Sequence, residues 1–395
     1  MADTQFPAQA PTLPLSAAGA RVLLGSINDP LQLVIPVAPT ACTMFGPRGL
    51  WLFAENGPLW VADTGHHRLL GWKKLPTEDG QAADWVIGQP HFEQEGQNAK
   101  GNPSHATVSV PTGICQCGEG MAVGDAWNHR VLIWHEVPQD SNVPADIVLG
   151  QADFHHNEPN RGCLETAGDR LHWPYGVFSH AGKLFVADTG NRRVLIWNHL
   201  PTENGQPADV VLGQSSMTLR NENGGGTPTA ASLRWGHSIT VWNGNLAVVD
   251  AGNNRVMIWK GIPTETNTPC AIVLGQQTFH TVDINQGSYY PSNRSLNLPY
   301  GITVANTWLL VADTANSRLL GWRDRPDLAG LHAAPADGLA AQYDFQSKGE
   351  NRSYGLPQRD SLCWPYAVHA CGNTVAIADS GNNRVLLWDL IPTNH

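Results

Sequence analysis

The chain has 395 residues with 34 acidic and 24 basic side chains, and its net charge of −10 argues against binding to nucleic acid or to an anionic membrane surface, which needs clustered Lys and Arg. Hydrophobic residues make up 42% and charged residues only 15%, a balance that argues against disorder, and no apolar run reaches the length of about 18 residues that a transmembrane helix needs. Forty glycines, 28 prolines and 15 tryptophans favour a turn-rich, all-β protein with short strands.

The first predicted segment, residues 1–19, is expected to be a flexible tail. It has no basic region followed by an apolar stretch, so no secretory signal is expected. The seven cysteines hold no fixed position along the chain, which together with the missing signal favours reduced thiols and a cytoplasmic location. The next segment, "RVLLG" at Arg21–Gly25, is predicted to be a single β-strand.

From residue 59 onward, one phrase recurs six times. Its third copy, "LFVADTGNRRVLIW", covers Leu184–Trp197, and every copy keeps an Asp, an Arg five residues later and a Trp four residues after that. The aspartates are 62, 63, 62, 63 and 66 residues apart, and so regular a period predicts a repeat architecture. The aspartates are Asp63, Asp125, Asp188, Asp250, Asp313 and Asp379; the arginines are Arg68, Arg130, Arg193, Arg255, Arg318 and Arg384; the tryptophans are Trp72, Trp134, Trp197, Trp259, Trp322 and Trp388.

Each repeat contains predicted β-strands separated by turns. In the third repeat, an inner strand at Pro174–Ser179 is followed by a turn at Ala181–Gly182, two strands joined by Thr189–Arg192, and an outer strand that begins at Asp209. Gly, Asn and Asp at these turns supply the positive φ angles that tight turns require. Four antiparallel strands in each of six units predict a six-bladed β-propeller, a single domain over residues 20–395. The predicted blades cover residues 47–89, 110–151, 173–214, 235–276, 298–346 and 364–392.

The sixth repeat lacks an outer strand of its own. The first five repeats each have one, the fifth in a degenerate form near Leu339–Phe345, whereas the sixth is followed only by "DLIPTNH". The strand Arg21–Gly25 has the wording of an outer strand, and it lies 22 residues before Pro47, close to the 23 residues between Gly88 and Pro111. We therefore predict that residues 20–25 complete the last blade and close the ring, which removes two exposed sheet edges.

The repeats resemble those of the NHL-repeat family of six-bladed β-propellers over residues 20–395. The shared elements are Pro-x-Gly in the inner strand, L-x-V-A-D at the end of the second strand, N-x-R in the turn and V-L-G-Q in the outer strand. Some propellers of this kind are lyases with a metal held by His around the channel. Here only His237 falls on the predicted inner ring, so neither a metal nor another cofactor is predicted. RNA binding, as in some NHL proteins, needs a basic face that this charge balance does not supply.

The repeated Asp and Arg are interpreted as structural rather than catalytic, because six copies do not point to one active site. In this interpretation the Asp accepts hydrogen bonds from turn N–H groups, and the Arg pairs with a neighbouring carboxylate or carbonyl. The six repeated tryptophans are expected to pack between adjacent blades rather than to hold a cofactor.

The residue after each inner-strand Pro differs between repeats, which packing alone does not demand. By propeller geometry this residue stands at the mouth of the central channel, and in three repeats a Trp precedes it on the same face. A polar ring with aromatic walls is typical of a small-ligand pocket, and the alternative is a plug with ordered water. The mouth positions are Arg48, Thr112, Tyr175, His237, Tyr300 and Tyr366, and the tryptophans are Trp173, Trp235 and Trp364.

The connections from each outer strand to the next inner strand are about 20 residues long, which indicates either a function or caps that pack on themselves. They should share the upper face with the channel mouth and form a broad surface for a protein partner. A scaffold that presents this face to a protein is therefore the leading hypothesis, with no nucleic-acid or membrane partner. The alternative is an enzyme, a lyase or hydrolase, in which His237, Arg48 and the ring tyrosines form a small-ligand site with Tyr as base and Arg as oxyanion stabiliser.

Overall fold

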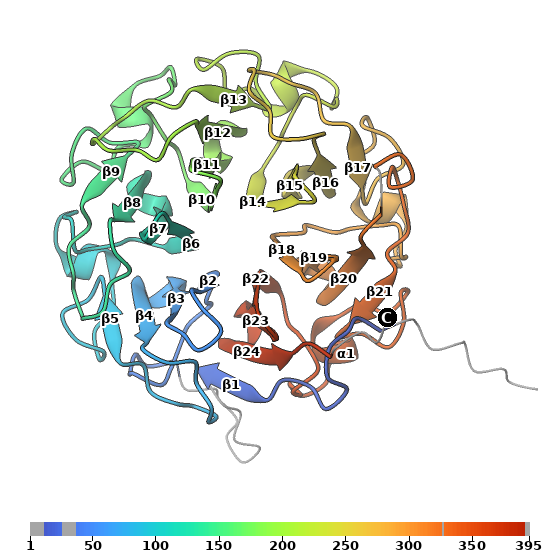
Figure 1. Ribbon diagram of the computed structural model, residues 1–395, viewed down its shortest axis with the longest axis horizontal. Coiled ribbons are helices and arrows are strands. Elements are labelled where there is room, and N and C mark those ends of the chain that lie inside the picture. Colours follow the sequence, from blue (N-terminus) through green and yellow to red (C-terminus); the bar gives the residue numbers. More distant parts are fainter. Residues whose placement is uncertain (1–11, 26–36, 326–327, 392–395) are drawn as a thin grey trace, which may run out of the picture.

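The computed structural model describes residues 12–25, 37–325 and 328–391. Within these residues, 24 strands form six antiparallel sheets of four strands each, arranged as a ring (Figure 1). Each sheet is one blade, and its innermost strand faces the centre of the ring. The predicted all-β, six-bladed propeller is therefore confirmed. No helix among the described residues has the length and apolar character needed to span a bilayer.

The blades follow one another around the ring in chain order, each running from an inner to an outer strand. Blade 1 contains β2 (Gly49–Leu52), β3 (Leu59–Asp63), β4 (Arg68–Trp72) and β5 (Trp85–Ile87). Blade 2 contains β6 (Pro111–Cys117), β7 (Gly120–Asp125), β8 (Arg130–Trp134) and β9 (Ile147–Leu149). Blade 3 contains β10 (Pro174–His180), β11 (Lys183–Asp188), β12 (Arg193–Trp197) and β13 (Val210–Leu212).

Blades 4 to 6 repeat this plan. Blade 4 contains β14 (Gly236–Trp242), β15 (Asn245–Asp250), β16 (Arg255–Ile258) and β17 (Ile272–Leu274). Blade 5 contains β18 (Gly301–Ala305), β19 (Trp308–Asp313), β20 (Arg318–Arg323) and β21 (Gly338–Ala340). Blade 6 contains β22 (Pro365–Cys371), β23 (Thr374–Asp379), β24 (Arg384–Asp389) and, as its outer strand, β1 (Val22–Gly25).

Short helical turns occupy two fixed positions in the repeat. Between the second and third strands lie η1 (Thr64–His66), η3 (Ala126–Asn128), η5 (Thr189–Asn191), η7 (Ala251–Asn253), η9 (Thr314–Asn316) and η10 (Ser380–Asn382). In the connections between blades lie η2 (Gln97–Lys100), η4 (Pro159–Gly162), η6 (Glu222–Gly225), η8 (Ile284–Gly287) and α1 (Glu350–Tyr354).

The ring is closed by the N-terminal strand, as predicted. Strand β1 pairs antiparallel with β24, with Val22 opposite Leu387 and Leu24 opposite Val385 (Figure 1). Val22 and Leu24 are buried against residues of blades 1 and 6. Blade 6 is therefore built from the two ends of the described chain.

The expectation of a flexible tail over residues 1–19 is corrected for residues 12–19, while residues 1–11 lie outside the described chain. Leu13 and Leu15 are only 2% and 6% exposed, and both belong to the core between blades 5 and 6. The carbonyl of Ser16 accepts a hydrogen bond from the indole N–H of Trp388 at 2.8 Å. In blade 3 the equivalent indole, that of Trp197, donates to Gln206 in the connection that follows it. Residues 12–19 thus replace the connection that blade 6 lacks.

Each repeated Asp forms a buried ion pair with the Arg that follows it. In blade 3, Asp188 accepts hydrogen bonds from the Arg193 Nε and from the side chain of Asn191, both at 2.7 Å, and from the backbone N–H of His172. The remaining guanidinium N–H groups of Arg193 donate to three backbone carbonyls in the flanking connections. The Nε–Oδ2 distance is 2.7–2.9 Å in all six blades. These contacts tie the turn of a blade to the connections on both sides of it.

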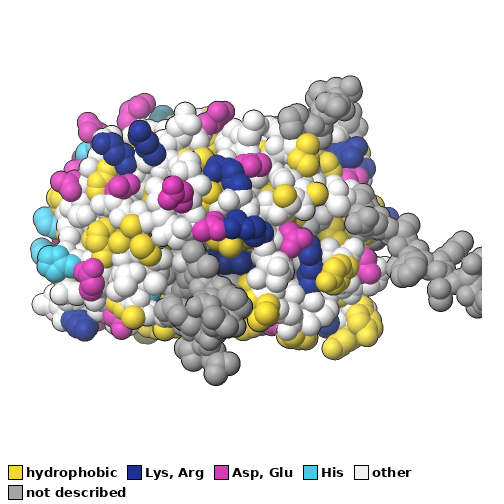
Figure 2. Space-filling model, turned by 90° about the horizontal axis from the view of Figure 1, so that it is seen from below, with side chains coloured by type: hydrophobic (Ala, Val, Ile, Leu, Met, Phe, Trp, Pro, Cys, Tyr) yellow, Lys and Arg dark blue, Asp and Glu magenta, His cyan; other side chains and the backbone are white. Residues whose placement is uncertain are grey.

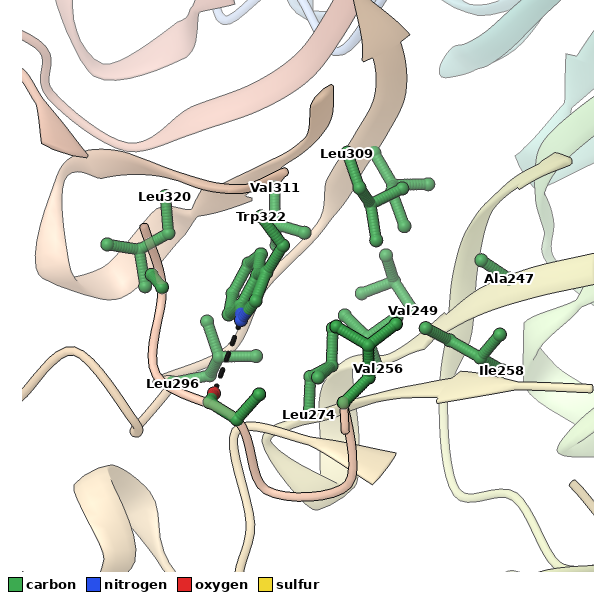
Figure 3. Packing of buried hydrophobic residues seen from close by; sticks show 14 of the residues in the cluster. Ala247, Val249, Val256, Ile258, Leu274, Leu296, Leu309, Val311, Leu320 and Trp322 are labelled. Atoms are coloured by element: carbon green, nitrogen blue, oxygen red, sulfur yellow. Dashed lines mark hydrogen bonds between the residues drawn. The ribbon is translucent and has the colours of Figure 1, made fainter. Parts of the chain in front are cut away.

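The six repeated tryptophans are buried between blades, as predicted. The core consists of six apolar clusters, and each is formed by residues of two neighbouring blades and contains one of these tryptophans. Figure 3 shows the cluster between blades 4 and 5, where Trp322 lies among aliphatic side chains of both blades. Its indole N–H donates to the carbonyl of Ala334 at 3.2 Å, so the polar atom of this large side chain is satisfied.

The rim of the ring carries charges of both signs. Figure 2 shows one side of the molecule, on which Lys and Arg alternate with Asp and Glu and no large patch of one sign forms. This distribution gives the visible rim no strong field that would steer a highly charged partner to it.

Candidate functional site

The channel mouth and the connections between blades lie on one face of the ring, which we call the upper face. Each inner strand begins where the second strand ends, as Pro174 opposite Asp188 shows, and the outer strand ends beside the start of the third. The turns between second and third strands, the long connections and the starts of the inner strands therefore share this face. All six predicted mouth residues accordingly lie at the upper end of the channel.

A cavity of about 200 Å³ runs down the channel from this mouth, and all six predicted mouth residues line it. Arg48 and Tyr300 directly precede β2 and β18, while Tyr175, His237 and Tyr366 are the second residues of their strands. A volume of this size holds on the order of ten water molecules, or one small organic molecule.

Five of the mouth residues contact one another in a closed ring, which we call the mouth ring. The rings of Tyr175 and His237 have centroids 4.8 Å apart, those of His237 and Tyr300 stack at 4.2 Å, and those of Tyr300 and Tyr366 lie 4.6 Å apart. The Arg48 guanidinium carbon is 4.7 Å from the centroid of Tyr366, and Arg48 also hydrogen-bonds the hydroxyl of Tyr175. The mouth ring therefore converges on one opening, with nitrogen and hydroxyl groups from five blades.

Thr112 takes a different part from the other five. It is 1% exposed, and its hydroxyl donates to the backbone carbonyl of Tyr175 at 2.9 Å. The structure therefore assigns it to the joint between blades 2 and 3, and the prediction that it binds ligand is corrected. Its small side chain leaves the gap across which Arg48 reaches Tyr175.

Below the mouth ring the channel is apolar and narrow. A Cβ atom on Gly176 would overlap the carbonyl oxygen of His237, so Gly is required there for the inner strands to approach each other. At the other end of the cavity, Trp51 stacks on His369 with centroids 3.8 Å apart, a pair that sequence reasoning missed. The aliphatic layer between the two ends consists of Leu50, Ile114, Val177, Ile239, Ile302 and Val368.

Arg48 carries the formal charge of the mouth at neutral pH. Burial lowers the pKa of His237 to about 3, against a small opposing effect of the Trp235 carbonyl, so this imidazole is neutral. Burial raises the pKa of the Tyr300 and Tyr175 hydroxyls, so both keep their protons. No Asp or Glu is among the described residues that line the cavity.

The tryptophans before the inner strands lie outside this cavity. Trp173, Trp235 and Trp364 are 45%, 38% and 48% exposed on the upper face, and none of them lines the channel, which corrects the expectation that they form its walls. Trp173 and Trp364 have positive φ angles of 50° and 51°, so the alternation of an extended strand does not reach them. Phe45 and Trp127, which sequence reasoning missed, are also exposed on this face, by 47% and 48%. We call these five side chains the aromatic belt.

The connections between blades are packed on themselves. In blade 3, the side chains of Asn160 and Asn191 form two reciprocal hydrogen bonds of 3.0 and 2.8 Å, and Asn191 also contacts the buried Asp188. Five blade turns are joined to a connection in this way, so the length of the connections is explained by the fold. The pairs are Asn98–Asn128, Asn160–Asn191, Asn223–Asn253, Asn285–Asn316 and Asn351–Asn382.

Histidine at one joint between blades makes the fold sensitive to acid. The Nδ1 of His129 accepts the backbone N–H of Trp173 at 3.2 Å, and burial lowers the pKa of His129 to about 4. Between pH 6.5 and 4 the unfolded chain therefore binds a proton that the folded chain does not, and stability falls as the pH falls through this window.

We expect His129→Asn to move the midpoint of acid unfolding to lower pH while stability at pH 8 changes little. Asn254 already makes the same hydrogen bond, to the N–H of Leu298 at 2.8 Å, so the new side chain can keep the contact without binding a proton. Unfolding followed by circular dichroism against pH measures this. The exposed His135→Asn is the control, and an equal shift in both variants would contradict the assignment.

The described residues offer no ready metal site. Among them, no group of three or more His, Cys, Asp and Glu side chains is placed to hold a metal ion. His66 instead pairs with the carboxylate of Asp63, Nδ1 to Oδ2 2.7 Å, at the position that Asn occupies in the other five blades.

Comparison with models of protein families and with curated protein sequences gives no match. Among solved structures, the chain is similar to an auxiliary nutrient binding protein from Bacteroides thetaiotaomicron, with 12% identity, a TM-score of 0.52 and coverage of 94% of this chain and 75% of that one. It is also similar to hydrazine synthase of Kuenenia stuttgartiensis (12% identity, TM-score 0.49, 91% and 98% of the chains) and to virginiamycin B lyase from Staphylococcus aureus (10%, 0.42, 89% and 98%). At these identities the similarity concerns the fold alone.

Proposed function

We propose that this chain is a cytoplasmic propeller of the NHL-repeat type that binds a protein partner on its upper face. The observation that carries the proposal is the aromatic belt, whose five side chains are each 38–48% exposed on one face. Exposed groups of large apolar side chains mark interaction sites on soluble proteins, and Trp is enriched among the residues that dominate binding energy.

The rigidity of the upper face supports the same proposal. The reciprocal Asn pairs and the buried Asp–Arg pairs fix the connections before any partner arrives, so less conformational entropy is lost on binding. All seven cysteines are free, which is in keeping with a reducing compartment.

We expect Trp127→Ala and Trp235→Ala each to weaken binding of the partner by roughly thirtyfold, equivalent to about 2 kcal/mol for a residue at the centre of an interface. The partner is captured from an extract of the source cells, purified, and titrated by calorimetry against wild type and both variants. Ile391→Ala is the matched control, because Ile391 is 46% exposed but lies beyond the opposite end of β24.

Chemical cross-linking of the complex supplies a second readout. Cross-links from the partner should concentrate on the upper-face connections. A partner that cross-links only to the rim or the opposite face, or that loses affinity equally in all three variants, would overturn the proposal.

The second candidate is an enzyme, a lyase or hydrolase, at the channel mouth. The convergence of Arg48, His237 and the tyrosines around one cavity favours it. General acid–base catalysis is most effective when the pKa of the group lies near the working pH. The pKa of His237 is about 3 and that of Tyr300 is raised by burial, so neither group exchanges protons readily near neutrality. This is why binding, rather than catalysis, is our first proposal.

A further inference from the structure

The mouth ring holds a cation without an anionic partner among the described residues. Arg48 stands at the opening of the cavity with its guanidinium over the ring of Tyr366 and one hydrogen bond to Tyr175. No described carboxylate pairs with it, and none lines the cavity. The other five repeats hold Thr, Tyr, His, Tyr and Tyr at this position, so the charge is peculiar to blade 1.

The surroundings of Arg48 are matched to an anion of a particular shape. A guanidinium presents five N–H donors in one plane, of which two can bind the two oxygens of a carboxylate side by side. The protonated hydroxyls of Tyr175, Tyr300 and Tyr366 surround the same opening and can donate further hydrogen bonds. A single positive charge neutralises a monoanion, whereas a phosphate dianion would enter this partly apolar site only half neutralised.

The channel below accounts for the rest of such a ligand. Six aliphatic side chains, led by Leu50 and Val177, surround the cavity beneath the mouth ring, and Trp51 and His369 lie at its far end. A volume of about 200 Å³ admits a small apolar group from above while the charged end stays at the opening.

We propose that the channel mouth binds a carboxylate carried on a small apolar body, with the carboxylate held by Arg48 and the tyrosine hydroxyls and the body in the aliphatic channel. The carboxylate has two sources, a free small carboxylic acid or the C-terminus of a peptide chain. This site is separate from the partner surface proposed above and does not depend on it.

The test uses pairs of probes that differ only in charge. Wild-type protein is titrated by calorimetry with 3-phenylpropionate and 3-phenylpropanamide, and with N-acetylphenylalanine and its amide as models of a chain end. Phenyl phosphate is titrated as the competing anion. We expect at least one carboxylate to bind tenfold or more tightly than its amide, and the better of the two acids identifies the source.

Variants of Arg48 locate the binding. Arg48→Gln should abolish the advantage of the acid over the amide, whereas Arg48→Lys, which keeps the charge but not the paired donors, should retain part of it. Arg323→Gln is the matched control, because Arg323 also lies over an aromatic ring, that of Trp308 at 5.1 Å, but lines no part of the cavity. Thermal unfolding of each variant shows whether it is folded.

Three results would overturn the proposal. They are equal binding of acid and amide or no binding of either acid at 10 mM, tighter binding of phenyl phosphate than of both acids, and an unchanged preference for the acid in folded Arg48→Gln.

Discussion

Leu24→Ala should lower the free energy of unfolding by about 2–5 kcal/mol, the usual cost of removing a fully buried Leu side chain. Leu24 lies in β1 and is 0% exposed between blades 1 and 6, although it is more than 350 residues from its partner strand in the sequence. Its loss weakens the only contact that joins β1 to β24 along its buried side, so the ring opens more easily. Urea unfolding followed by Trp fluorescence measures the change.

Two controls make this result specific to ring closure. Leu212 has the same place in the outer strand of blade 3 and is also 0% exposed, so Leu212→Ala should cost a similar amount. Leu164 is 88% exposed, and Leu164→Ala should change stability by no more than about 0.5 kcal/mol. If Leu24→Ala behaves like Leu164→Ala, β1 does not close the ring in solution.

Asp188→Asn should lower the free energy of unfolding by about 3–5 kcal/mol, because it leaves the buried guanidinium of Arg193 without its counter-charge. Both side chains are 0% exposed, and the three carbonyls that Arg193 also contacts are neutral. The cost therefore comes mainly from an uncompensated buried charge. The same urea measurement applies.

An exposed ion pair provides the comparison. Arg161 and Asp169 are 2.6 Å apart with side chains 23% and 31% exposed, so Asp169→Asn should cost about 1 kcal/mol or less. Similar losses in the two variants would contradict a structural role for the repeated Asp–Arg pairs.

The architecture was predictable because the repeat keeps its register. The positions of Asp188, Arg193 and Trp197 recur in six copies, and the copy without an outer strand indicated where β1 must go. The convergence of Arg48, Tyr175 and the other mouth residues followed from the same register, since each stands at one place in its inner strand.

What the repeat does not encode could not be predicted from it. Residues 12–19 occupy the place of a connection without sharing its sequence, so the burial of Leu13 and Leu15 had no visible pattern. Trp173 was placed in the channel by assuming extended backbone, but its positive φ directs the side chain elsewhere. The different fates of Thr112 and Tyr175 depend on side-chain size across a joint between blades, which spacing along one chain does not reveal.

The closure of the ring also sets an order of events during synthesis. Strand β1 is among the first segments to leave the ribosome, yet β24, the strand it pairs with, is made roughly 360 residues later. At 5–20 residues per second this is a delay of about 20–70 s, during which a short apolar strand has no partner and presents an open edge. Blades 1 to 5 can each form from contiguous chain as it emerges, so the first strand made is the last to be placed.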